Sequence, residues 1–271
     1  MDPIDRIRET SCFLFDLDGT VYLGDQLLPG ARELLDYLGA RNVPCYFLTN
    51  NSSRSREDYA AKLTGFGLTT DRERIFSSGM ATAIYIKKDK PGARVYLVGT
   101  PSLEKEFRDF GFQLVDENPD VAVLGFDTTL TYAKIRRLCD FVLAGIPYIA
   151  THPDINCPTP DGFMPDIGAM MAMVEASTGR EADLIIGKPQ SPMIEAITNL
   201  TGYQADQLTM VGDRLYTDIA LGKAGIQTVL VLSGETRRED LVEAPHKPDL
   251  VCENLAELLL FLRGGLVGSD Q

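Results

Sequence analysis

Short hydrophobic segments alternate with helix-like segments along most of the chain. Near the two ends, the apolar runs predict buried strands at 11–15, 43–48, 208–211, 228–232 and 250–251. The segments between them predict helices at 29–38, 54–63, 217–224 and 254–262. Alternating strands and helices are typical of an α/β fold with a parallel sheet. We therefore predict a doubly wound, Rossmann-like core.

The middle of the chain has an alternation of its own. Strands are predicted at 94–98, 121–124 and 148–150, and helices at 101–110, 132–144 and 167–177. About a hundred residues are enough for a domain. We predict a second α/β domain at 79–183, inserted into a core made of 1–78 and 184–271.

Net charge limits the possible binding partners, and cysteine usage indicates the cellular compartment. The 271 residues include 26 Lys and Arg against 39 Asp and Glu, a net charge of −13. Nucleic acids and anionic membranes need basic patches, so this balance argues against both. A small anionic metabolite still fits, because a divalent cation can make one pocket locally positive. Five scattered cysteines without paired metal spacing fit a reducing cytoplasm, where we expect the protein.

Two acids follow the first predicted strand. That strand ends at Asp16, and Asp18-Gly19 comes directly after it. Ligands in open α/β sheets collect at the carboxyl ends of strands. Two carboxylates at this spacing can share a pocket, one as nucleophile and one as proton carrier. The alternative is a solvated Asp-Gly turn.

Two further segments carry groups suited to binding phosphate. Thr49-Asn50 follows the second strand, and its hydroxyl, amide and backbone N–H groups can cradle an anion; the alternative is a helix N-cap cluster. Lys188, between Gly187 and Pro189, could neutralise a bound phosphate; the alternative is a solvated surface lysine.

A second pair of acids comes late in the chain. Asp213 follows the strand at 208–211 and repeats the pattern of Asp16, while Asp218 precedes a predicted helix. Hard oxygen donors of this kind suit Mg²⁺. For Asp218 the alternative is an acid that interacts with the helix dipole.

Together these motifs occur in the order of a known family. They are Asp16-Leu-Asp18-Gly-Thr, Thr49-Asn-Asn, Lys188-Pro and Gly-Asp213-Arg-Leu-Tyr-Thr-Asp218. The chain resembles the haloacid dehalogenase superfamily of phosphatases over nearly its whole length. The run Thr49-Asn-Asn-Ser-Ser and the segment from Pro153 to Met170 resemble its NagD-like, 4-nitrophenylphosphatase-like branch. In that branch a large α/β cap lies between the second and third motifs, as residues 79–183 do here.

The resemblance implies a role for each acid. Asp16 would be the nucleophile, forming an aspartyl-phosphate, and also a metal ligand. Asp18 would be the general acid and then base, with its backbone carbonyl on the metal. Asp213 would bind Mg²⁺ directly, and Asp218 would support that ligand shell.

The resemblance also implies how substrate is held. Thr49 and the Asn50 backbone would bind phosphate, and Lys188 would neutralise it. The implied activity is Mg²⁺-dependent hydrolysis of small phosphate monoesters, such as sugar, polyol or nucleotide phosphates, with 4-nitrophenyl phosphate as an artificial substrate. Caps of this branch often dimerise, so a homodimer through the cap is an open expectation.

A proline-rich loop in the cap is the predicted determinant of leaving-group choice. It presents the polar residues His152, Asp154, Asn156 and Asp161. The core motifs grip only the phosphoryl group, which every candidate substrate shares, so discrimination must come from elsewhere. The alternative is that these residues form turns, with Asp166 capping the following helix.

Two other functions use similar residues. A phosphotransferase on the same scaffold would pass the phosphoryl group to another hydroxyl compound instead of water. A receiver-like phosphoacceptor or binding module would carry the acids without turnover. The motif order and the inserted domain argue against the receiver.

Overall fold

The computed structural model describes residues 3–159 and 162–264, and the chain divides into two compact units. The first unit holds the residues up to Leu48, Thr64–Thr70 and the residues from Ile197 onward. The second unit holds Thr49–Leu63 and Asp71–Ala196.

A parallel sheet of hydrophobic strands forms the centre of the first unit. Its strands in this unit follow the order β15 (Leu250–Cys252), β14 (Gln227–Val231), β13 (Leu208–Gly212), β1 (Cys12–Phe15) and β4 (Cys45–Thr49). Neighbouring strands are parallel, and Phe15 lies opposite both Val211 and Phe47. β1, β13 and β14 are buried along their full length, as expected for a parallel sheet covered on both faces.

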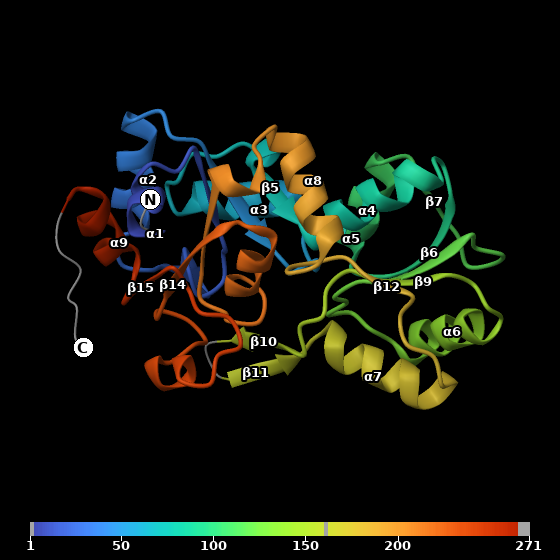
Figure 1. Ribbon diagram of the computed structural model, residues 1–271. Coiled ribbons are helices and arrows are strands. Elements are labelled where there is room, and N and C mark those ends of the chain that lie inside the picture. Colours follow the sequence, from blue (N-terminus) through green and yellow to red (C-terminus); the bar gives the residue numbers. More distant parts are fainter. Residues whose placement is uncertain (1–2, 160–161, 265–271) are drawn as a thin grey trace. The chain divides into compact units, whose positions relative to one another are not determined.

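Helices and short turns complete the first unit. They are α1 (Pro3–Arg8), α2 (Ala31–Ala40), α9 (Leu255–Leu262), the 3₁₀ segments η2 (Ala205–Gln207), η3 (Ile219–Ala224) and η4 (Arg238–Leu241), and the hairpin of β2 (Tyr22–Leu23) with β3 (Gln26–Leu27). α2 and α9 lie side by side (Figure 1). α2 buries Ala31, Leu34 and Leu38, which share one helix face.

The helix predicted at 217–224 is wrong in type and length. The segment is the 3₁₀ helix η3, in which the Leu221 N–H donates to the Asp218 carbonyl at 3.3 Å. It stops at Gly225, whose positive φ of 87° ends the helix. The segment therefore has only six helical residues, beginning at Ile219 instead of at residue 217.

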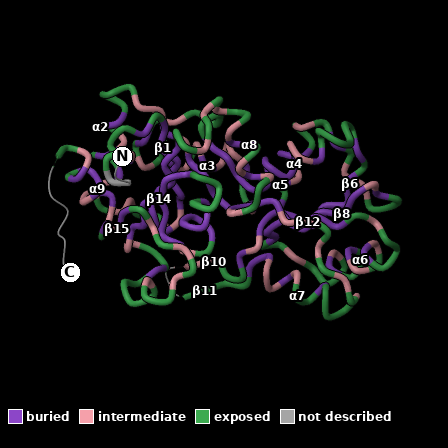
Figure 2. The backbone as a smooth tube through the Cα atoms, viewed as in Figure 1, coloured by how far each residue is buried: buried purple, intermediate pink, exposed green. Residues whose placement is uncertain are grey.

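The second unit has its own five-stranded parallel sheet. The order is β12 (Leu184–Ile185), β9 (Tyr148–Ala150), β8 (Val121–Leu124), β6 (Arg94–Val98) and β7 (Gln113–Leu114). α4 (Ser78–Asp89) and α5 (Pro101–Asp109) lie on one side of it, and α6 (Tyr132–Leu143) and α7 (Ile167–Thr178) lie on the other (Figure 1). The strands of both sheets carry the buried residues, while the outer helix faces are exposed (Figure 2).

The remaining elements are short or connect the units. They are η1 (Arg72–Arg74), β5 (Ile75–Ser77), α3 (Arg56–Gly65) and α8 (Ser191–Thr201), the last two of which span unit boundaries. The predicted loop also contains an antiparallel ribbon, β10 (Asn156–Thr159) with β11 (Gly162–Pro165). Each strand of a two-stranded ribbon has a free edge, so Pro158 and Pro165 are tolerated within it.

The predicted α/β architecture with parallel sheets is confirmed. The predicted insertion, 79–183, falls within the second unit, which extends beyond it at both ends. The domain boundaries themselves stay a prediction. No helix in the described ranges is both long and apolar enough to span a membrane.

Candidate active site

Two acids of the first unit leave neighbouring strands at the same sheet edge. Asp16 follows β1 and Asp213 follows β13, and these strands pair in parallel register. The Asp16 N–H donates to the Val211 carbonyl at 2.9 Å, which continues the ladder into the site. β4 lies on one side of β1 and the later strands lie on the other. This reversal point is where open α/β sheets bind ligands.

Asp16, Asp213 and Asp218 form a buried group of carboxylates, which we call the acid group. One carboxylate oxygen from each lies within 4.8 Å of the others. Burial, and next the charge of Asp218, raise the pKa of Asp213 to about 7. Because these are hard oxygen donors that repel one another, a Mg²⁺ ion fits the set.

The Asp213 carboxylate is fixed by close backbone packing. The Glu235 N–H donates to its Oδ2 at 2.7 Å, and the Thr20 hydroxyl donates to its Oδ1 at 3.4 Å. A Cβ on Gly19 or Gly234 would lie 2.5 or 2.0 Å from Oδ2, so both positions require glycine. The sequence interpretation missed Thr20, Gly234 and Glu235. The turn after β14, at the same sheet edge, was the available signal.

Asp218 is fully buried and faces the strand end. Its Oδ2 accepts from the Arg214 N–H at 3.1 Å, and its side chain caps no N–H of η3. A Cβ on Gly212 would lie 2.3 Å from its Cγ, so strand and carboxylate are in close contact. Asp218 is therefore packed as part of the acid group, and it also stands at the N-cap position of η3, where the helix-dipole alternative places it.

Asp18 differs from the acid group in its exposure. It is half-buried, two residues after Asp16, and forms a single bridge with Tyr22. The turn is closed by the Gly19 N–H, which donates to the Tyr22 carbonyl at 2.8 Å. The structure therefore leaves Asp18 partly accessible to a substrate or water.

The predicted phosphate-binding residues lie in the second unit. Thr49 ends β4, and its hydroxyl accepts from the Asn51 N–H at 3.1 Å. Ser55, by contrast, caps α3. Its N–H and hydroxyl donate to Asp58 Oδ2, and the Asp58 N–H donates to the Ser55 hydroxyl. This is the N-cap arrangement that was the alternative for this segment. Capping thus accounts for Ser55 but not for Thr49 or Asn50.

Lys188 is not a solvated surface lysine. Only 1% of it is exposed, and its backbone N–H donates to Asn50 Oδ1 at 2.7 Å. Asn50 Nδ2 in turn donates to the Lys188 carbonyl at 3.1 Å. The structure therefore joins two of the predicted motifs, although 138 residues separate them.

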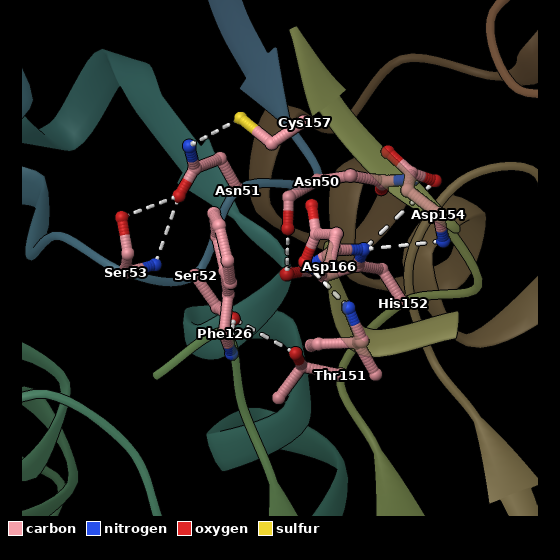
Figure 3. A network of polar contacts seen from close by, with 12 residues as sticks. Asn50, Asn51, Ser52, Ser53, Phe126, Thr151, His152, Asp154, Cys157 and Asp166 are labelled. Atoms are coloured by element: carbon pink, nitrogen blue, oxygen red, sulfur yellow. Dashed lines mark hydrogen bonds and ion pairs between the residues drawn. The ribbon is translucent and has the colours of Figure 1, made fainter. Parts of the chain in front are cut away.

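The predicted leaving-group residues divide into two kinds. His152 and Asp154 are buried and take part in a polar network (Figure 3). Asn156 is exposed at the start of β10. Asp161 lies outside the described residues. Only Asn156 of the three described residues therefore presents its side chain at the surface of the second unit.

Comparison with known proteins identifies the family. Residues 13–113 match the model described as haloacid dehalogenase-like hydrolase, and residues 185–258 match a model described as HAD-hydrolase-like. The 5'-nucleotidase YutF of Bacillus subtilis is 36% identical over 251 residues, covering 92% of this chain and 98% of that protein. The chain belongs to the haloacid dehalogenase-like hydrolases.

Two solved structures are similar over nearly all of this hydrolase. The 4-nitrophenylphosphatase of Thermotoga maritima matches with a TM-score of 0.90 and 47% identity, over 93% of this chain and 97% of its own. A putative NagD protein matches with a TM-score of 0.87 and 44% identity, over 94% and 98%. The resemblance to the NagD-like branch is confirmed, and the enzyme is a hydrolase of phosphoric monoesters.

Proposed function

We propose that this hydrolase cleaves small phosphate monoesters with Mg²⁺ and carries the phosphoryl group on Asp16. The observation that carries the proposal is the acid group, three buried carboxylates within 4.8 Å of one another. Buried like charges stay ionised near neutral pH when a cation compensates them. Asp16 and Asp213, with the Asp18 carbonyl, would hold Mg²⁺, and Asp218 would support them. When bound, Mg²⁺ lowers the repulsion between phosphate and the attacking carboxylate.

The first step transfers the phosphoryl group to Asp16. A carboxylate oxygen of Asp16 forms a bond to phosphorus while the bond from phosphorus to the leaving oxygen breaks. The carboxyl proton of Asp18 passes to that leaving oxygen, so an alcohol departs. Asp18 suits this role because it is half-buried and only two residues from the nucleophile.

The second step restores the enzyme. The oxygen of a water molecule attacks phosphorus, the phosphorus–Asp16 bond breaks, and Asp18 takes the proton of the water. Inorganic phosphate leaves, and both carboxyl groups return to their starting states. The balance is one monoester and one water giving one alcohol and one phosphate.

Phosphate oxygens would be bound by neutral donors and one cation. We assign this role to the Thr49 hydroxyl, the Asn50 N–H and the Lys188 ammonium. Lys188 is buried, so its charge is less screened than that of a surface lysine. Such preorganised groups stabilise the charge that develops in the transition state.

The substrates would be small metabolites with a phosphate ester. Similar proteins are named a 5'-nucleotidase and a 4-nitrophenylphosphatase, so the family accepts both nucleoside and aryl leaving groups. We propose nucleotide, sugar or polyol phosphates as natural substrates and 4-nitrophenyl phosphate as an artificial one. Exposed Asn156, on the β10–β11 ribbon, is a candidate contact for the leaving group.

The test is phosphate release from a metabolite panel, with Mg²⁺ and after verified metal removal by EDTA. We expect release that depends on Mg²⁺ and is restored by adding it back. Undiminished release in EDTA would reject the metal assignment. Adding glycerol as an acceptor separates hydrolysis from phosphotransfer, because a transferase would form glycerol phosphate.

A further inference from the structure

One carboxamide holds both backbone groups of Lys188. Asn50 Oδ1 accepts from the Lys188 N–H at 2.7 Å, and Asn50 Nδ2 donates to the Lys188 carbonyl at 3.1 Å. A side chain that binds the donor and acceptor of the same residue fixes both its position and its orientation. Asn50 is 4% exposed, so water competes little for these bonds.

Asp154 stabilises one orientation of the Asn50 carboxamide. Asn50 Nδ2 also donates to Asp154 Oδ1, at 2.9 Å. A carboxylate can only accept, so a flipped amide would place its oxygen against two acceptors, Asp154 and the Lys188 carbonyl. Asp154 therefore adds to the stability of the single amide orientation that can hold Lys188.

Asp154 is itself held on its backbone (Figure 3). Its N–H donates to His152 Nδ1 at 3.4 Å, and its carbonyl accepts from the Gly168 N–H at 2.7 Å. His152 Nε2 lies 3.5 Å from Asp166 Oδ1, and Asp166 caps α7 by accepting from the Ile167 N–H at 2.6 Å. The network therefore begins at the first turn of α7.

The packing of Gly187 is independent evidence that the chain before Lys188 is held by this network. A Cβ at this position would lie 2.6 Å from both Asn50 Oδ1 and His152 Cβ, and 2.9 Å from the Thr151 carbonyl oxygen. The Gly187 N–H also donates to that carbonyl at 2.8 Å. The chain before Lys188 is thus pressed against the same residues that orient Asn50.

We infer that Asp154 is a positioning residue for Lys188 and acts on it through Asn50, with His152 and Asp166 holding Asp154 in place. The inference rests on the proposed function in one respect, that Lys188 binds the phosphoryl group. In this role His152 and Asp154 affect the hydrolysis of every substrate equally. Contact with the leaving group would instead affect only some substrates. Both residues are buried in the second unit, at 0% and 3% exposure.

The experiment compares Asp154→Ala, Asp154→Asn and Lys188→Met in the full-length enzyme with Mg²⁺. One lost hydrogen bond corresponds to about 10-fold in rate. We expect Asp154→Ala to lower kcat/KM about 10-fold, and equally, for 4-nitrophenyl phosphate and for a nucleoside monophosphate. Asp154→Asn should recover most activity, because its amide oxygen can still accept from Asn50. Asp116→Ala, an exposed acid in the same unit, is the matched control.

The second readout is binding of inorganic phosphate by calorimetry. Lys188→Met should weaken binding, and adding Asp154→Ala to it should weaken binding no further, because Asp154 acts only through Lys188. Additive losses, or a loss confined to the nucleotide substrate, would overturn the inference. Full activity and phosphate affinity in Lys188→Met would instead reject the proposed role of Lys188. If Asp154→Ala does not fold, the isosteric Asn50→Asp removes the same donor and should give equal losses on both substrates.

Discussion

The acid group of the first unit and the Asn50–Asp154 network of the second are both buried and polar, but they are satisfied differently. The acid group places three carboxylates together, and burial raises the pKa of Asp213 to about 7. In the network, both carboxylates accept hydrogen bonds from protein donors: Asp154 accepts from Asn50, and Asp166 accepts from Ile167.

This difference supports the two proposals, that the acid group binds a ligand and that the network holds Lys188 in place. An acid group with net repulsion is stabilised by a cation from outside, so its geometry has a purpose beyond folding. Carboxylates that accept hydrogen bonds from protein donors need no cation, and such bonds make the surrounding chain rigid. The two kinds of site should therefore respond differently to substitution, metal and pH.

The largest effect is expected from Asp16, the proposed nucleophile. Asp16→Asn should reduce turnover at least ~1000-fold, about 4 kcal/mol of barrier, because the amide cannot form the phosphoryl bond. Asp18→Asn should also be severely impaired, since it removes the proposed proton carrier. Steady-state phosphate release measures both, with the exposed Asp36→Asn on α2 as control. More than about a tenth of wild-type activity in Asp16→Asn would contradict a covalent mechanism.

A second prediction concerns stability against pH in metal-free enzyme. The pKa of Asp213 is about 7 when folded, against 3.8 ordinarily. The folded state therefore binds more protons between these values, so the free energy of unfolding should fall as pH rises from about 4 to 7. The contribution is on the order of 1–4 kcal/mol.

Unfolding measured in EDTA from pH 5 to 8 checks this prediction. Mg²⁺ should restore stability most at pH 8, above the pKa of Asp213, and Asp213→Asn should flatten the pH dependence. Wild type and Asp213→Asn with parallel curves would show that Asp213 is not the responsible group. Asp154→Asn leaves the acid group intact, so its unfolding should keep the wild-type dependence on pH and Mg²⁺.

A third prediction locates the choice of leaving group. Asn156→Ala should lower kcat/KM for the best natural substrate by ~1–3 kcal/mol and leave 4-nitrophenyl phosphate nearly unchanged. The reason is that Asn156 is exposed, whereas His152 and Asp154 are buried. Equal losses on both substrates would give Asn156 a structural role. The exposed Glu117→Ala serves as control in the same unit.

The smallest effect is expected from a methyl group. Gly187→Ala would place Cβ 2.6 Å from Asn50 Oδ1, so the chain must shift, at ~1–3 kcal/mol of stability. Gly39→Ala meets no atom within 4 Å and lies inside α2, where alanine should be neutral or stabilising. Thermal unfolding of the pair measures the difference. Equal stabilities would mean that the residues around Gly187 can move to accept a Cβ without a cost in stability.

Much of the fold and several site residues followed from local patterns. Apolar runs ending at an acid predicted that Asp16 and Asp213 leave strands, and parallel pairing brings those ends to one edge. The type of η3 was missed, because six residues before Gly225 look helical until their hydrogen bonds are known. The β10–β11 ribbon was missed because its prolines argue against strands in a larger sheet.

Contacts between distant residues could not be predicted from one sequence. Nothing near Asn50 indicates that its carboxamide binds Lys188, because the partner is 138 residues away. Gly234 and Gly187 likewise require glycine because of Asp213 and Asn50, which lie elsewhere in the chain. Loop polarity suggested surface contacts for His152 and Asp154, but tertiary packing buries both.

The Asn50 carboxamide, which we propose holds Lys188 in place for phosphate binding, also has a consequence for how the enzyme acquires activity as it folds. Its two hydrogen bonds close a loop of 138 residues, and such long-range contacts form only after the entropy of closing that loop has been lost. We therefore expect Lys188 to be held late in folding. We expect refolding enzyme to regain far-ultraviolet circular dichroism before phosphatase activity, so that a half-folded chain is inert rather than an indiscriminate hydrolase.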